Sequence, residues 1–195
     1  MPSASASRSS SPAEAKPGDR LVAALAATRI GTTFNQYACS PLRRQRLRDY
    51  LAGRAAAPVL LVGEAAGWRG ARVSGLPFTS ERQLTGSGPA EATATIVQRT
   101  LAELGLAEQV LLWNLVPTHP HRPAEPRSNR PPNVTEIAAA ATFLAELSRG
   151  RRVLAVGRLA HARLGGPYLR HPSHGGRSGF KNGLAELLES GVISR

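Results

Sequence analysis

The chain has 195 residues, a net charge of +12 and 42% hydrophobic residues. This length suits one domain with a full core, and no apolar run is long enough to span a bilayer. The cations are almost all arginines, which favours contacts with nucleic-acid phosphates and bases, although biased genomic coding also produces arginine-rich chains. The single cysteine, Cys39, excludes an intrachain disulfide and a thiolate-bound cluster and is typical of the reducing cytoplasm.

The N-terminal residues 1–18 are rich in Ser, Ala and Pro and lack the apolar core of a secretory signal. We expect a disordered tail there, with a basic organellar transit segment as the alternative, and a single domain over residues 19–195. Asp19 is a candidate cap for a helix over Arg20 to Ile30. Pro41 suits the first turn of a second helix that reaches Ala52.

A run of aliphatic residues predicts a first strand over Pro58 to Val62. It leads into the glycine-bracketed sequence Gly63-Glu64-Ala65-Ala66-Gly67, which we interpret as a tight loop of the kind that holds ligands in α/β folds. A helix over Ala90 to Leu104 and a second strand over Gln109 to Leu115 follow. The segment from Val116 to Asn133 is dense in Pro, Arg and His and is expected to be irregular.

The second half of the chain begins with a helix that carries a start signal. Asn133 and Glu136 have the spacing of a capping box before a helix over Val134 to Ser148. Further elements are expected at Arg152 to Val156 (strand), Tyr168 to Arg170 (strand) and Phe180 to Glu189 (helix).

This alternation of strands and helices predicts a three-layer α/β/α sandwich around a central, mainly parallel four-stranded sheet. The loops after the first, second and fourth strands contain most of the chemically distinctive residues. Because the carboxyl ends of parallel strands share one edge of a sheet, we expect these loops to converge.

Three segments of the sequence carry a resemblance to a known family. Gly63-Glu64-Ala65-Ala66-Gly67, with Gly75-Leu76-Pro77-Phe78, looks like a first motif and its base-stacking loop. Trp113-Asn114-Leu115-Val116, with Asn129-Arg130-Pro131, looks like a second, and His171-Pro172-Ser173 looks like a third. Together they resemble the uracil-DNA glycosylase superfamily, and most closely its bacterial and archaeal branches marked by Gly-Glu-Ala-Pro-Gly (family 4 and its relatives).

The chain also departs from the pattern of those branches. Ala66 replaces the usual proline, and the cysteines of an iron–sulfur cluster are missing, so no cofactor is expected. The loop Trp68 to Ser74 lacks the histidine of a branch that captures the abasic sugar covalently. In the best-known branch an aspartate stands at Ala65 and a tyrosine at Gly67. Their absence leaves open which group activates water and what excludes thymine.

The resemblance implies a uracil pocket with catalytic residues Glu64, Asn114 and His171. Phe78 would stack on the base, Asn114 would pair with O4 and N3–H, His171 would donate to O2, and Glu64 would act on the water or the sugar. Each has a structural alternative: a core phenylalanine, a strand-end cap, a turn histidine and a carboxylate that caps its own loop. The uracil-binding set is Gly63, Ala65, Phe78, Asn114 and His171.

A second group of residues is expected to contact DNA, with solvated surface charge as the alternative for each arginine. His119 and His121 belong to the same basic loop, and their spacing is not a standard metal set, so no metal site is expected. Such contacts make binding salt-sensitive, with a log–log slope of about −0.9 per phosphate neutralised on duplex DNA. The candidates are Arg69, Arg72, Arg122, Arg130, Ser173, His174, Gly175 and Arg177.

The resemblance therefore implies a monomeric, cytoplasmic, nucleoid-associated enzyme of base-excision repair without a membrane partner. It would hydrolyse the N-glycosidic bond of uracil in DNA and leave an abasic site. No lysine lies in the three motifs, so no associated lyase activity is expected. The alternative function is a catalytically weak protein of the same fold that binds damaged or abasic DNA.

Overall fold

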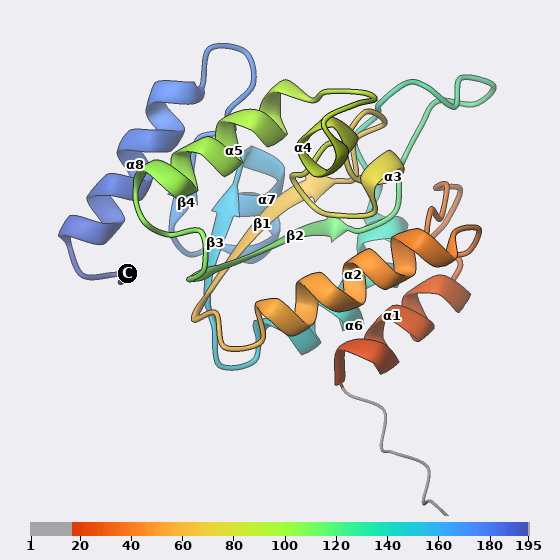
Figure 1. Ribbon diagram of the computed structural model, residues 1–195, viewed down its shortest axis with the longest axis horizontal. Helices are drawn as coiled ribbons and strands as arrows, with labels where there is room; N and C mark the ends of the chain where they lie inside the picture. The colour runs from red at the N-terminus through yellow and green to blue at the C-terminus, as the bar shows by residue number, and fades with distance from the viewer. Residues whose placement is uncertain (1–16, 195) are drawn as a thin grey trace, which may run out of the picture.

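The computed structural model describes residues 17–194, which form a parallel sheet between two layers of helices (Figure 1). The strands are β1 (Val59–Ala65), β2 (Val110–Val116), β3 (Arg152–Val156) and β4 (Tyr168–Leu169). Their order is β2-β1-β3-β4, and each neighbouring pair is parallel. The predicted α/β fold with a four-stranded sheet is confirmed, and the sheet is parallel throughout.

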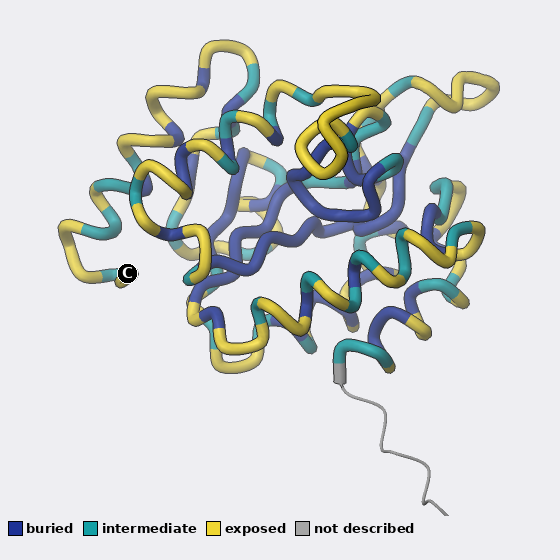
Figure 2. Tube along the Cα trace, viewed as in Figure 1, coloured by how far each residue is buried: buried dark blue, intermediate teal, exposed yellow. Residues whose placement is uncertain are grey.

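The sheet separates two hydrophobic clusters because alternate residues of each strand face opposite layers. Leu60 and Val62 of β1 pack in the cluster that also holds residues of α1 (Pro17–Ala27), α2 (Pro41–Gly53), α6 (Val134–Ser148) and α7 (Arg158–Leu164). Val59 and Leu61 pack in the other, with α5 (Ala92–Glu103) and α8 (Arg177–Glu189). Figure 2 shows the strands as the buried centre of the molecule.

Most of the residues predicted to start a helix do so in the structure. The Asn133 side chain accepts a hydrogen bond from the Glu136 N–H at 2.9 Å, and the Glu136 carboxylate accepts one from the Asn133 N–H at 3.0 Å, which confirms the capping box. The Ser40 hydroxyl accepts from the Arg43 N–H at the start of α2. The prediction for Asp19 was wrong, since α1 begins at Pro17 and places Asp19 inside the helix.

Several boundaries differ from the predictions. The strand β1 runs three residues further than expected, because Ala65 still pairs with Val116 of β2, so Gly63 and Glu64 lie on the strand and not in a loop. Two short helices that the sequence did not predict, α3 (Ala71–Ser74) and α4 (Glu81–Thr85), follow it. The predicted tail lies outside the described residues except for Pro17 and Gly18, which belong to α1.

The carboxyl ends of the strands share one edge of the sheet. There the chain continues from β1 into α3, from β2 into the long loop 117–133, and from β4 into the loop 170–176. Within residues 17–194, no helix has the length and apolar character that a membrane crossing requires.

Candidate active site

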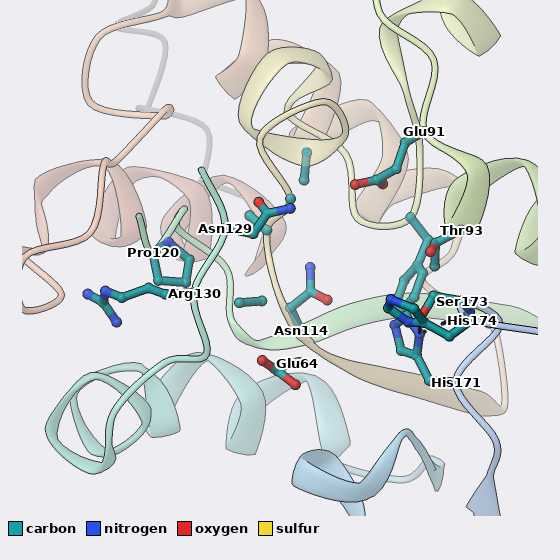
Figure 3. A pocket seen from close by; sticks show the side chains of 15 residues that line it. Glu64, Glu91, Thr93, Asn114, Pro120, Asn129, Arg130, His171, Ser173 and His174 are labelled. Atoms are coloured by element: carbon teal, nitrogen blue, oxygen red, sulfur yellow. Dashed lines mark hydrogen bonds between the residues drawn. The ribbon is translucent and has the colours of Figure 1, made fainter. Parts of the chain in front are cut away.

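A cavity of about 430 Å³ opens at this edge of the sheet (Figure 3). Side chains from all three motif segments meet around it, together with two residues at the start of α5. The lining residues are Glu64, Ala65, Ala66, Gly67, Ala71, Phe78, Glu91, Thr93, Asn114, Pro120, Asn129, Arg130, His171, Ser173 and His174.

Phe78 lines the cavity although its side chain belongs to the hydrophobic core. Its φ of 47° lies in the left-handed region, which costs a non-glycine residue about 1–3 kcal/mol and is typical of functional sites. Surrounding groups hold this backbone: Gln98 donates a hydrogen bond to the Phe78 carbonyl at 3.2 Å, and the Ser74 hydroxyl donates to the Thr79 carbonyl at 2.6 Å. The ring is therefore held at the cavity wall.

Gly63 does not line the cavity but makes room for two residues that do. A Cβ at this position would collide with the Phe78 ring and lie 2.9 Å from the Asn114 Oδ1. The φ of Gly63 is not in the left-handed region, so close packing is what requires glycine here. The strand register supports this arrangement, because Gly63 and Asn114 are direct partners in β1 and β2.

Asn114 is 5% exposed and brings a free amide to the cavity. Its side chain makes no hydrogen bond with any residue of the described chain, so the interpretation as a strand-end cap does not hold. A buried amide normally has partners. The NH2 group and the carbonyl oxygen of this amide both remain for a ligand.

His171 lies across the cavity from Glu91 and is tied to its own loop through Nδ1 (Figure 3). The Ser173 N–H donates to Nδ1 at 3.2 Å, and the Ser173 hydroxyl lies 2.7 Å from the same atom. Since Nδ1 accepts, the proton of the neutral ring lies on Nε2. Burial, and secondly the charge of His174, lowers the pKa of His171, which favours this neutral form.

The loop around His171 has a strained backbone. His174 has a φ of 51° and is exposed, and its Nδ1 lies 2.9 Å from the Ser173 hydroxyl. Gly175 has a φ of 74°, while a Cβ at Gly176 would collide with the His171 carbonyl oxygen. This close turn fixes the direction of the His171 ring.

Glu64 is half-buried and is one of the residues that line the cavity (Figure 3). Its carboxylate forms no hydrogen bond or ion pair with residues 17–194, so it does not cap the backbone of its own segment. Burial raises the pKa of Glu64, because the charged form loses water without gaining a partner. A carboxyl group in this state is typical of functional sites.

Sequence reasoning missed a second carboxyl group, Glu91, and its neighbour Thr93. Both come from the start of α5 and line the cavity, and Glu91 is half-buried. Burial also raises the pKa of Glu91. Glu91 belongs to none of the motifs, and nothing in its spacing relates it to Glu64, so only the folded chain reveals it.

Arg130 is expected to bind DNA, but its donors are already used inside the protein. Its guanidinium forms a two-pronged ion pair with Glu136, at 2.8 and 2.6 Å, and its Nε donates to the His121 carbonyl at 2.9 Å. The Glu136 side chain is fully buried. Arg130 therefore holds the loop 117–133 against α6 while its side chain lines the cavity.

The other predicted DNA contacts divide into two groups. Ser173 and His174 line the cavity, whereas the remaining residues lie outside its lining. Arg122 is exposed and 3.4 Å from Glu125, and Arg177 is exposed at the start of α8.

Two arginines of the segment after β1 stack on aromatic rings. Arg69 is exposed, and its guanidinium carbon lies 4.7 Å from the centre of the Trp68 ring. The Arg72 guanidinium lies 4.6 Å from the Phe34 ring, and its Nε is buried without a hydrogen-bond partner. Burial, and secondly repulsion from Arg43 and Arg127, lowers the pKa of Arg72.

His119 does not contact phosphates as expected, because it is fully buried. Its Nδ1 lies 2.8 Å from the Ala66 carbonyl oxygen, which can only accept, so Nδ1 carries the proton. His119 thus joins the loop after β2 to the end of the first motif. Within residues 17–194 no three His, Cys, Asp or Glu side chains are grouped as metal ligands.

Comparison with known proteins identifies the family. The family model described as the uracil DNA glycosylase superfamily matches residues 52–189, which is more than half of the chain. The crystal structure of wild-type Pedobacter heparinus SMUG2 is similar in fold, with a TM-score of 0.64 and 12% sequence identity, over 88% of this chain and 97% of that one. No curated protein sequence matched. The chain belongs to the uracil DNA glycosylase superfamily.

Proposed function

We propose that this protein is a monofunctional DNA glycosylase that removes uracil from DNA by hydrolysis and leaves an abasic site. The observation that carries the proposal is the meeting of Phe78, Asn114 and His171 around one cavity, next to the unpartnered Glu64 carboxylate. These groups supply a stacking face, an edge reader, a hydrogen-bond donor and an anion. They are the groups that cleavage of a nucleoside requires.

Recognition depends on Phe78 and Asn114. The uracil nucleotide leaves the base stack, at a cost of a few kcal/mol, and its ring stacks against Phe78. The free Asn114 amide donates to O4 and accepts from N3–H. Cytosine presents a donor and an acceptor in the opposite order, so a fixed amide rejects it.

Departure of the base depends on His171. The bond between C1′ and N1 breaks with its electron pair on the base, and negative charge develops on O2. The Nε2–H of the neutral imidazole donates a hydrogen bond to O2, and this contact strengthens as the charge grows. Because Ser173 occupies Nδ1, the proton is held on the nitrogen that serves the reaction.

The remaining step takes place at the sugar. Loss of the base leaves a cationic sugar that needs only a weak nucleophile, so water adds to C1′ and releases one proton. The Glu64 carboxylate stabilises the cation and accepts this proton. No lysine of the three motifs is present to form an imine, so we propose no lyase activity, and no cofactor or metal takes part.

DNA binding is the task of the surface around the cavity. The net charge of +12 and the exposed Arg69, Arg122 and Arg177 favour a polyanionic partner. The left-handed backbone at His174 and Gly175 lets that loop approach the duplex closely. We propose a cytoplasmic, nucleoid-associated monomer, nearest to the Gly-Glu-Ala-Pro-Gly branches by residues 63–67 and 75–78.

The test is incubation with single- and double-stranded oligonucleotides that contain one uracil, followed by alkali. Strand scission at the uracil supports the proposal, and its absence at enzyme excess would refute it.

The alternative, a weakly catalytic binding protein, is motivated by Ala65 and Ala66 in the first motif. It predicts preference for abasic over intact duplex without scission. A borohydride-trapped adduct would contradict the absence of lyase activity.

Replacement of Glu64 by glutamine is expected to lower excision by roughly 100-fold, the lower end for a positioned acid–base group. The folded protein should not lose stability. The pKa of Glu64 is raised in the folded state, so stability falls as pH rises through the interval between the ordinary and the raised pKa, and glutamine removes this penalty. Melting temperature at pH 7.5 and single-turnover rates measure both effects, with the exposed Glu189→Gln as control. Reduced stability with an unchanged rate would show a structural role.

A further inference from the structure

We propose that Glu91 is a specificity-determining residue that closes one end of the pocket against pyrimidines with a methyl group at C5, and so separates uracil from thymine. This inference rests on the proposed function. It starts from the position of a carboxylate that the mechanism above does not use.

Glu91 stands at the residue before α5 but does not cap the helix, because its side chain accepts no hydrogen bond from the first turn. The carboxylate points toward the cavity instead (Figure 3). It forms no hydrogen bond or ion pair with the described residues. Glu91 therefore presents an unneutralised, half-buried acceptor to any base that enters.

Two glycines make room for this carboxylate. A Cβ at Gly67 would collide with the Glu91 Oε1, and one at Gly70 would collide with its Oε2 and lie 2.7 Å from its Cδ. Neither glycine has a φ in the left-handed region, so the space, and not the backbone conformation, requires them. The carboxylate is thus packed between the two glycines and forms a wall of the cavity.

The orientation of the base determines which ring edge meets this wall. Asn114 reads N3 and O4, His171 donates to O2, and N1 bears the sugar, which leaves C5 and C6. In a pyrimidine ring C5 lies directly opposite C2, the carbon that carries O2. Figure 3 shows Glu91 on the opposite side of the cavity from His171. The C5 position of the bound base therefore points toward Glu91.

A methyl group at C5 would press against the Glu91 carboxylate, exclude water from it and offer no hydrogen bond in return. Burying a charge without a partner is strongly unfavourable. The hydrogen at C5 of uracil leaves space for water at the oxygens. Discrimination of this kind comes from a penalty on the wrong base, and one methyl group in a fitted pocket already gives roughly 10–200-fold.

The experiment compares wild type, Glu91→Ala and Glu91→Gln, with Glu189→Gln as a control for loss of a carboxylate. Excision is measured on oligonucleotides with one uracil or thymine. Binding is measured with 2′-fluoroarabino analogues of both nucleotides, in which fluorine suppresses cleavage. We expect Glu91→Ala to lower the preference for uracil over thymine by at least about 10-fold, both in the ratio of excision rates and in the ratio of analogue affinities. The bulk of glutamine keeps part of the discrimination.

A Glu91→Ala protein that binds the two analogues with the wild-type ratio would overturn the inference. The binding assay does not depend on catalysis. If no variant releases a base but the binding ratio shifts as expected, the proposed reaction fails and the role of Glu91 stands.

Discussion

Replacement of His171 by alanine is expected to lower the single-turnover rate of uracil excision by about 10²–10³, the usual effect of removing a donor from developing negative charge. DNA affinity should change little, because it depends on the surface arginines. His161→Ala is a matched control, since His161 is exposed on α7 and contacts the Tyr168 ring. A rate loss below threefold in the His171 variant would remove this residue from the mechanism.

The pH dependence of the wild-type rate provides a second test of His171. Burial lowers the pKa of His171, and protonation of Nδ1 would break the hydrogen bond that this atom accepts from the Ser173 N–H. The neutral ring should therefore persist below the ordinary histidine pKa of about 6.5. Activity is expected to be flat from pH 8 to about 6.5 and to fall only at lower pH. A decline that is already complete at pH 7 would contradict this assignment.

Replacement of Glu136 by glutamine is expected to destabilise the protein by about 3 kcal/mol, near the lower end for a broken buried ion pair, because Arg130 keeps 21% exposure. The melting temperature should fall by roughly 6–12 °C. Arg130 would lose its charged partner, and only the glutamine carbonyl oxygen would remain to accept from it and hold the loop 117–133 against α6.

The Arg130–Glu136 ion pair also predicts how the stability of the protein depends on pH. The Arg130 guanidinium lowers the pKa of Glu136 in the folded state, so its stabilisation is complete above the ordinary glutamate pKa and is lost as pH falls through the folded pKa. The difference between wild type and Glu136→Gln should shrink in acid. Glu125→Gln, which breaks the exposed pair with Arg122, is the control and should cost below about 1 kcal/mol. Equal losses for both variants would contradict the structural role of Glu136.

The fold could be predicted from local patterns because its two longest strands are largely aliphatic and buried. Val59–Ala65 and Val110–Val116 lie between two helical layers, and such strands form continuous apolar runs. The end of β1 could not be predicted. Gly63 and Glu64 are typical of a loop by residue type, but pairing of Ala65 with Val116 extends the strand through them. Tertiary hydrogen bonds decided this boundary, not propensity.

Some residues of the candidate site could also be predicted from the sequence, and others could not. Glu64 and Asn114 lie near the ends of β1 and β2, and His171 follows β4, so parallel topology predicts that these three converge. All three line one cavity together with Phe78. Glu91 belongs to no motif and reaches the cavity only because α5 packs beside the first motif.

The arginines and histidines of the loop 117–133 show a further limit of sequence reasoning. Arg130 was predicted from the sequence to contact DNA, but it forms an ion pair with Glu136. His119, in the same loop, is buried against the Ala66 carbonyl. Composition reports charge but not which charges are neutralised within the fold. The free cations, such as Arg69, can be distinguished from Arg130 only in three dimensions.

The most direct measurement is the release of free uracil from a uracil-containing oligonucleotide under single-turnover conditions, quantified by chromatography alongside the abasic sites that form. We expect one uracil for each abasic site with the wild-type protein, and a greatly reduced rate for His171→Ala. Absence of free uracil from both single- and double-stranded DNA at enzyme excess, with DNA binding intact, would contradict the proposed glycosylase activity.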